Sequence, residues 1–297
     1  MRWKRTQSTH VDDMRGRRGG MALPVTAGGG VIGLVILLLT TMLGGGGGGG
    51  AGGGLGDILG QLPGAAQQPQ PGEGGPTTEE SEFVNFLAED VQQVWAAKFA
   101  EDGRDYTYAR LNMFSGQVAT ACGNATAAVG PFYCPGDSEV YIDLDFFREL
   151  QTRFDAPGDF AQAYVIAHEF GHHVQNLLGT NEEVRRRQQA AGSEEEANQW
   201  SVRLELQADC YAGVWAQSVE ERGRQEGSDV ALEQGDIEEG LAAAEAVGDD
   251  RIQSQAGVEV NPETWTHGSS AQRQEWFDRG FDAGDPSRCD TFSESSL

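Results

Sequence analysis

Residues 168–173 read His-Glu-Phe-Gly-His-His, and this stretch restricts the fold of the chain most strongly. Side chains four residues apart project from one face of a helix, so a helix here would direct imidazole nitrogens of His168 and His172 at one zinc ion. Glu169 would then lie beside the metal, where its carboxylate can activate a zinc-bound water. The competing interpretation is an ordinary helix whose histidines are satisfied by neighbours. Three of the five histidines fall within these six positions, which favours the metal site.

A catalytic zinc site uses three protein ligands, so a third must come from elsewhere. The extended pattern H-E-x-x-H-x-x-G-x-x-H is not matched, because Gln175 and Leu178 stand at its glycine and last histidine. A carboxylate from a later helix is the usual alternative. We expect Glu205 to bind the metal and Asp209, one turn further on, to hydrogen-bond a ligating imidazole, unless both are solvated helix charges. The other carboxylates that can serve as ligand are Glu194, Glu195 and Glu196.

Composition divides the chain into segments. Residues 44–80 are mostly Gly, Pro, Gln and Ala, which bury too little apolar surface to order themselves, so we predict a disordered linker. The foldable part is then one domain over 81–292, followed by a short tail, 293–297.

The first 43 residues favour a membrane anchor. Residues 1–20 carry six Lys or Arg against two Asp, and the apolar segment 21–43 is long enough for one transmembrane helix. The basic flank predicts a cytoplasmic N-terminus and a catalytic domain outside the cell membrane. A cleaved signal peptide is the alternative, because the strictly apolar run 31–43 is followed by small residues.

The remaining chain is strongly acidic, with 15 basic and 44 acidic residues and a net charge of −29. This excess argues against nucleic acid as a partner, because phosphate contacts need Lys and Arg. We interpret the acidity as a property that keeps the domain soluble.

The periodicity of apolar residues predicts a helix-rich α+β fold with a small β-sheet. Strands are expected over 106–121 and 139–144, with a loop over 122–134 that has a strand at its end. Asp159 is the expected N-cap of the metal helix, and Gly179 its C-terminal stop. The other expected helices cover 79–100, a short segment from Phe146 to Phe154, 182–189, 194–222, 237–247 and part of 265–281.

The four cysteines form an even set outside the apolar segment, without C-x-x-C spacing. Disulfides are therefore expected in an oxidising compartment. Of the three connectivities, we predict Cys122–Cys134, which closes a short loop, and Cys210–Cys289, which fastens the C-terminal tail to the ligand helix.

The sequence resembles the putative neutral zinc metallopeptidases of bacteria, membrane-tethered proteins with a zincin-type domain. The resemblance covers nearly all of the chain outside the Gly-rich linker, and the opening Met1-Arg2-Trp3 also fits, although His10 and Met14 depart from the pattern. It implies zinc and the hydrolysis of a peptide or protein substrate. The motifs that carry it are 130–135, 140–147, 168–175, 205–213, 266–270 and 289–292.

The expected function is that of a zinc-dependent endopeptidase outside the cytoplasmic membrane. The alternative is a non-catalytic, membrane-tethered module that keeps zinc for structure, although such a site needs no base at Glu169. A tetrahedral intermediate also calls for a second donor to its oxyanion. His267 is the candidate for that role, with Tyr133 and Tyr211 as further possibilities. Otherwise His267 only ties down its loop.

Overall fold

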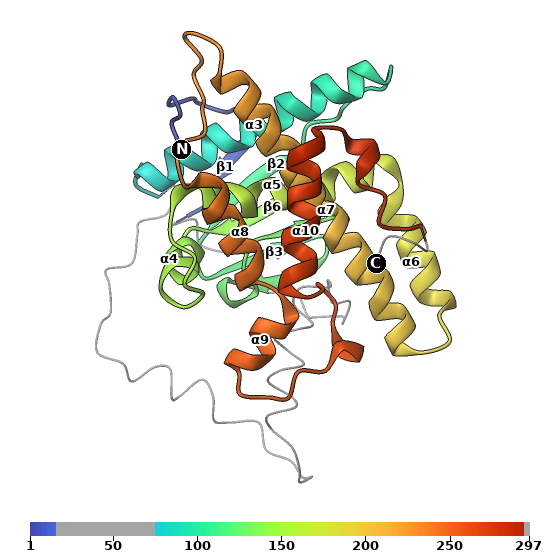
Figure 1. Ribbon diagram of the computed structural model, residues 1–297. Coiled ribbons are helices and arrows are strands. Elements are labelled where there is room, and N and C mark those ends of the chain that lie inside the picture. The colour runs from blue at the N-terminus through green and yellow to red at the C-terminus, as the bar shows by residue number, and fades with distance from the viewer. Residues whose placement is uncertain (16–74, 294–297) are drawn as a thin grey trace, which may run out of the picture.

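A computed structural model describes residues 1–15 and 75–293, in which helices surround a small mixed sheet (Figure 1). The sheet has the order β1-β2-β6-β5, with β1, β2 and β6 parallel and β5 antiparallel to β6. Its strands are β1 (Val11–Asp13), β2 (Arg110–Phe114), β5 (Phe132–Cys134) and β6 (Glu139–Asp143). The helix-rich α+β class predicted from the sequence is thus confirmed.

A separate hairpin joins β2 to β5. Its strands, β3 (Gln117–Thr120) and β4 (Gly123–Thr126), pair antiparallel through a turn at Ala121 and Cys122. The sequence predicted a loop here, and the structure corrects this for β4. Cys122 is bonded to Cys134 at the end of β5, which fastens the hairpin to the sheet. Cys210 is bonded to Cys289, so both predicted disulfides are present.

Most helices of the described residues follow the predicted periodicity, but the helix at 249–255 was not predicted. The helices are α3 (Glu79–Glu101), α4 (Asp145–Thr152), α5 (Asp159–Leu178), α6 (Thr180–Ala190), α7 (Glu194–Gly223), α8 (Asp236–Ala246), α9 (Asp249–Gln255) and α10 (Ser270–Ala283), with single 3₁₀ turns η1 (Ala127–Val129), η2 (Pro262–Thr264) and η3 (Pro286–Arg288). The first helix of the body begins two residues before the predicted domain boundary at 81, because Thr78 and Ser81 form a capping box.

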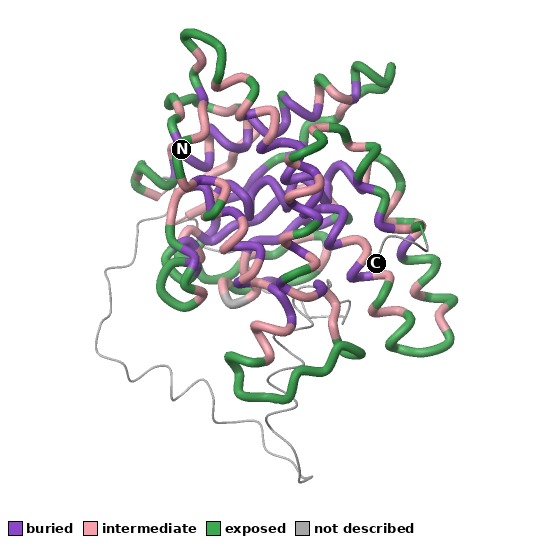
Figure 2. Tube along the Cα trace, in the orientation of Figure 1, coloured by how far each residue is buried: buried purple, intermediate pink, exposed green. Residues whose placement is uncertain are grey.

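Helix α5 is the central element, buried along most of its length between α3, α7 and α8 (Figures 1 and 2). Phe160, Tyr164 and Phe170 belong to the main hydrophobic core. Asp159 is not its N-cap as predicted: Gly158 takes that position, and the backbone N–H of Phe160 donates to Glu239. Gly179, at φ 82°, ends the helix as predicted, since it adopts the left-handed conformation that glycine tolerates best.

Helices α7 and α10 lie backbone to backbone. A Cβ atom at Gly280 would lie 1.9 Å from the carbonyl oxygen of Cys210, and one at Gly213 would lie 2.0 Å from that of Phe277. No side chain larger than hydrogen fits at these positions without moving a helix. This close approach brings α10 next to the carboxylates of α7.

Residues 1–15 form an arm that packs on the same body. Strand β1 extends the sheet beside β2, the Trp3 ring lies 5.1 Å from that of Phe83, and Arg2 forms a β-bridge with Ala231. The sequence treated 1–20 as a basic segment apart from the domain. In the described part of this segment, strand β1 pairs with β2 of the body.

Within these described residues, no helix is both long and apolar enough to cross a membrane. The predicted span 21–43 lies outside the described residues, as do the predicted linker up to residue 74 and the tail from residue 294.

Candidate metal centre

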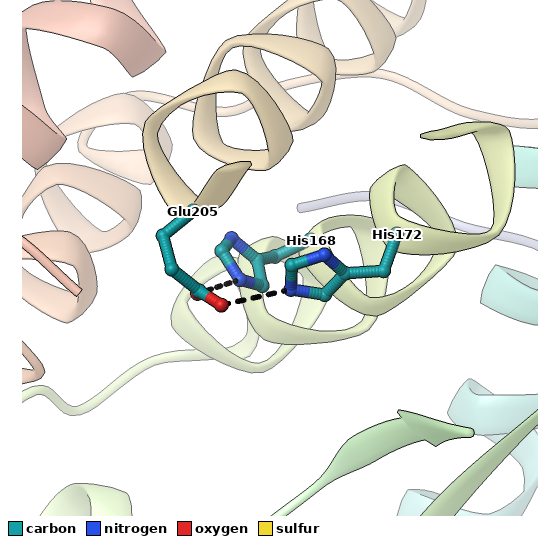
Figure 3. Close-up of side chains that lie close together, drawn as sticks. All are labelled: His168, His172 and Glu205. Carbon is teal, nitrogen blue, oxygen red and sulfur yellow. Dashed lines mark hydrogen bonds and ion pairs between the residues drawn. The ribbon is translucent and has the colours of Figure 1, made fainter. Parts of the chain in front are cut away.

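Two adjacent helices bring the predicted ligands together. His168 and His172 project from α5 towards Glu205 on α7, as Figure 3 shows. The Nε2 atom of His168 lies 3.1 Å from one Glu205 carboxylate oxygen, and that of His172 lies 3.5 Å from the other. Ligands about 2.0–2.1 Å from a tetrahedral zinc ion are separated by about 3.3 Å, so these spacings fit.

The ligand atoms of these three residues all lie within 4.8 Å of one another, and all three side chains are buried. Burial raises the pKa of Glu205, but the opposing effect of His172 and His168 is larger. The pKa of Glu205 therefore lies well below its usual range. Glu205 is therefore an anion, which is the form that binds a metal. The alternatives Glu194, Glu195 and Glu196 are exposed in the first turn of α7, so the structure brings Glu205 to the histidines and leaves these three apart.

Asp209 of α7 lies beside His168. One oxygen of its fully buried carboxylate lies 2.7 Å from Nδ1 of His168, which directs Nε2 towards Glu205. The same carboxylate accepts hydrogen bonds from the Tyr164 hydroxyl and, through both oxygens, from Arg273 of α10. Burial raises the pKa of Asp209, but Arg273 and His168 lower it by more. The pKa of Asp209 therefore lies below its usual value. The carboxylate is thus an anion that favours the Nδ1–H form of His168.

Gln175 orients the second histidine. Its amide oxygen lies 2.8 Å from Nδ1 of His172, so that His172 also turns Nε2 towards Glu205. Each candidate histidine ligand thus has an outer partner at Nδ1, which is the usual arrangement around zinc.

Glu169 is the residue that follows His168, and its carboxylate is buried. One carboxylate oxygen, Oε2, has no hydrogen-bond partner among the described residues. Burial raises the pKa of Glu169, an effect that His172 and His168 oppose. A buried carboxylate oxygen without a partner costs free energy, which a bound water beside the metal would recover.

His267 lies in a buried loop that Asp249 holds in place. The Asp249 carboxylate accepts the backbone N–H groups of Thr266, His267 and Gly268, and lies 3.2 Å from Nδ1 of His267. Burial lowers the pKa of His267, but Asp249 and the charge of Glu205 raise it above the usual value. The charge of Glu205, a candidate metal ligand, thus contributes to the raised pKa of His267.

The Tyr133 hydroxyl is engaged elsewhere, and the Tyr211 ring is buried in the core. The Tyr133 hydroxyl lies 3.1 Å from Nδ1 of His173, whose Nε2 lies 2.6 Å from the Thr107 carbonyl oxygen. The Tyr211 ring packs edge-on against Trp95.

The sequence did not reveal four polar residues of the centre, which are Arg273, Gln175, Gln207 and Asp249. Gln175 lies three residues after His172, within helical reach, and was noted only as a mismatch to another motif. Arg273 shows no local signal, because it meets Asp209 only after α10 packs on α7.

Two imidazoles and a carboxylate on adjacent helices, with a second carboxylate beside them, define a metal site of the kind found in metallopeptidases with the H-E-x-x-H motif. The family model described as "Putative neutral zinc metallopeptidase" matches residues 1–292, and the chain belongs to this family.

Curated relatives are known from several bacteria. "Uncharacterized protein YpfJ" of Escherichia coli (strain K12) is 42% identical over 299 residues, which cover 99% of this chain and 100% of the relative. "Uncharacterized protein Rv2575" of Mycobacterium tuberculosis (strain H37Rv) is 54% identical over 198 residues, 65% of each chain. No solved structure matches the chain.

Proposed function

We propose that this protein is a zinc-dependent endopeptidase. The observation that carries the proposal is the convergence of His168, His172 and Glu205 beside Glu169, whose Oε2 is buried and lacks a partner among the described residues. A structural zinc site usually closes with four protein ligands and needs no such carboxylate. Family membership supports the same class of reaction.

His168, His172 and Glu205 would hold the zinc ion, and Asp209 and Gln175 would keep both imidazole Nε2 atoms turned to it. Bound zinc supplies a Lewis acid that polarises the peptide carbonyl and acidifies water. Glu169 takes the proton of the attacking water on its free Oε2 and passes it to the leaving amine. Burial favours this role, because a raised pKa brings a carboxylate closer to the range useful for proton transfer at neutral pH.

We assign to His267 the second contact with the developing oxyanion. With Asp249 at Nδ1, the imidazole keeps its Nε2 available to donate when it is protonated, and its raised pKa favours that form. Asp249 acts as a positioning residue, because it binds the His267 ring and the backbone of its loop together.

The proposal is tested on the purified full-length chain with an unbiased library of peptides. We expect about one zinc ion per chain and cleavage at internal peptide bonds, because three protein ligands and a base are present. Cleavage should stop when a chelator removes zinc and return when one equivalent is restored. Tightly bound zinc without cleavage of any peptide would instead identify a non-catalytic zinc module.

We also propose that the domain works outside the cytoplasm. The two disulfides support this, since disulfides persist in oxidising compartments. The docked arm adds a constraint, because a strand bonded into the sheet shares the compartment of the body. A single span at 21–43 would put residues 1–15 on the other side of the membrane, so it is compatible only with an undocked arm.

Labelling in cells separates these arrangements. Single cysteines at two exposed positions, Gln7→Cys in the arm and Gln199→Cys on α7, are treated with a membrane-impermeant maleimide. We expect both variants to react alike, because the arm is part of the sheet. Reaction of the Gln199→Cys variant alone would show a cytoplasmic arm and a single span. Reaction of neither variant before lysis would place the domain in the cytoplasm and refute its external location.

A further inference from the structure

Two glutamine side chains connect the candidate ligand His172 to the backbone of Cys289, which a disulfide fastens to α7. Gln175 lies one turn after His172 on α5, and Gln207 lies on α7 between the ligand Glu205 and Asp209. Both amides are buried, so their hydrogen bonds face little competition from water.

The hydrogen bonds run in one continuous series. The backbone carbonyl of Cys289 accepts a hydrogen bond from the amide nitrogen of Gln207, at 2.9 Å. The amide oxygen of Gln207 accepts from the amide nitrogen of Gln175, at 3.1 Å, and the amide oxygen of Gln175 lies 2.8 Å from Nδ1 of His172. The second N–H of Gln175 donates to the Leu204 carbonyl, at 2.6 Å.

The direction of this series is set at its far end. A backbone carbonyl only accepts hydrogen bonds, so Cys289 requires Gln207 to present its NH₂ group, which leaves the Gln207 oxygen for Gln175. Gln175 must then present NH₂ to Gln207 and to Leu204, and its oxygen to His172. A carbonyl oxygen facing Nδ1 selects the Nδ1–H tautomer of His172, which leaves the Nε2 lone pair for a metal.

Cys289 is held in place by two attachments. Its sulfur is bonded to Cys210, three residues after Gln207 on α7. Two residues further on, the buried Thr291 donates its hydroxyl proton to the Arg203 carbonyl, at 2.6 Å. The disulfide is therefore the covalent attachment that fixes the first carbonyl of the series.

We propose that Gln175 and Gln207 are positioning residues for the metal ligand His172, and that the Cys210–Cys289 disulfide anchors them. The inference rests on the proposed function in one respect, that His172 is a zinc ligand. It assigns this disulfide a role in metal affinity in addition to its role in stability. The Cys122–Cys134 disulfide has no such role, because it ties the β3–β4 hairpin to the sheet.

Zinc affinity of the full chain, measured by competition with a chromogenic chelator, tests the series. Gln175→Leu should weaken zinc binding by about 10–100-fold, as expected for a direct partner of a ligating imidazole. Gln207→Leu should weaken it by about 2–30-fold, less than Gln175→Leu because the Leu204 carbonyl still holds Gln175. The double change Cys210→Ala with Cys289→Ala should have an effect similar to that of Gln207→Leu.

The decisive measurement combines the two changes. If the disulfide acts through Gln207, its removal should cause no further loss of zinc affinity in the Gln207→Leu background, although thermal stability falls again. Gln199→Leu, at an exposed position of α7, and the double change Cys122→Ala with Cys134→Ala are matched controls and should bind zinc within about 2-fold of wild type, the lower limit of coupling effects. Wild-type affinity in Gln207→Leu, or an equal loss on removing either disulfide, would overturn the proposal.

A metal-free measurement separates this inference from the proposed function. In the wild-type chain without metal, ¹⁵N shifts should show Nδ1 of His172 protonated, and Gln175→Leu should mix the two tautomers. An unordered tautomer in the wild-type chain would refute the series. Failure of the wild-type chain to bind zinc, with the tautomer ordered as stated, would refute the zinc site and leave only the positioning of His172.

Discussion

Replacing Glu169 by glutamine is expected to leave zinc bound and to lower kcat for peptide hydrolysis by about 10²–10⁴-fold, the usual contribution of a general base. Glutamine keeps the shape of the side chain but cannot take a proton from water. Among the described residues, no side-chain hydrogen bond links Glu169 to a candidate ligand, so zinc content should stay at its wild-type value. Thermal stability should not fall, because Oε2 of Glu169 has no hydrogen-bond partner among the described residues to lose. The measurements are kcat, zinc content and thermal unfolding of the same preparation.

Glu195→Gln is the matched control for this change. Glu195 is exposed in the first turn of α7, so its variant should keep both zinc and wild-type turnover. Unchanged hydrolysis in Glu169→Gln would show that another group is the base. Loss of zinc together with activity would show instead that Glu169 helps to hold the metal.

The same assay distinguishes His267 from the base. His267→Ala should keep zinc and lower turnover by about 10²–10³-fold, the size of effect expected for one lost oxyanion donor. A variant with normal turnover, or one that loses stability and activity together, would return His267 to the structural role of tying its loop to Asp249.

Replacing Arg273 by methionine is expected to destabilise the protein by about 3–5 kcal/mol, because it leaves the Asp209 carboxylate as a buried charge without its cation. Arg273 donates from Nε and from one terminal nitrogen to the two oxygens of Asp209, each at 2.8 Å, and both side chains are buried. For a chain of this size, the loss corresponds to a drop in Tm of about 6–20 °C. Zinc affinity should also fall, since Asp209 orients His168.

The pH dependence of this loss identifies its cause. Because the folded-state pKa of Asp209 is lowered, the ion pair stabilises the protein above the carboxyl's unfolded pKa, and this contribution disappears as the pH falls. Without Arg273 the pKa of Asp209 rises and the carboxyl takes up a proton in acid. The deficit in free energy of unfolding should therefore be largest near neutral pH and shrink at acidic pH.

Arg186→Met is the control for the loss of an arginine. The ion pair of Arg186 with Glu183 is exposed, so its removal should cost at most about 1 kcal/mol. Adding Asp209→Asn to Arg273→Met should recover part of the lost stability, because it removes the uncompensated charge. A deficit in Arg273→Met that is the same at all pH values would indicate lost packing and would contradict the electrostatic explanation.

The sequence by itself determined the features that depend on neighbours along the chain. Helical spacing places His168, Glu169 and His172 on one short stretch of α5, and apolar periodicity located most helices and strand β6. The need for a third zinc ligand then favoured a carboxylate of the next long helix. In the structure, Glu205 of that helix lies beside both histidines. Both disulfides were also predicted, because Cys122 and Cys134 close a short loop and this leaves Cys210 to pair with Cys289.

Tertiary structure alone decided which distant groups support the site. Arg273 reaches Asp209 because two glycines, Gly213 and Gly280, let α10 approach α7, and nothing near either residue in the chain encodes that meeting. The strand in the N-terminal arm also could not be predicted from the sequence. Strand β1 is three residues long and pairs in parallel with β2, about a hundred residues away, so its apolar pattern is too short to predict a strand. Local sequence sets the propensity of each segment, but the partners of buried polar groups are fixed only when the segments pack.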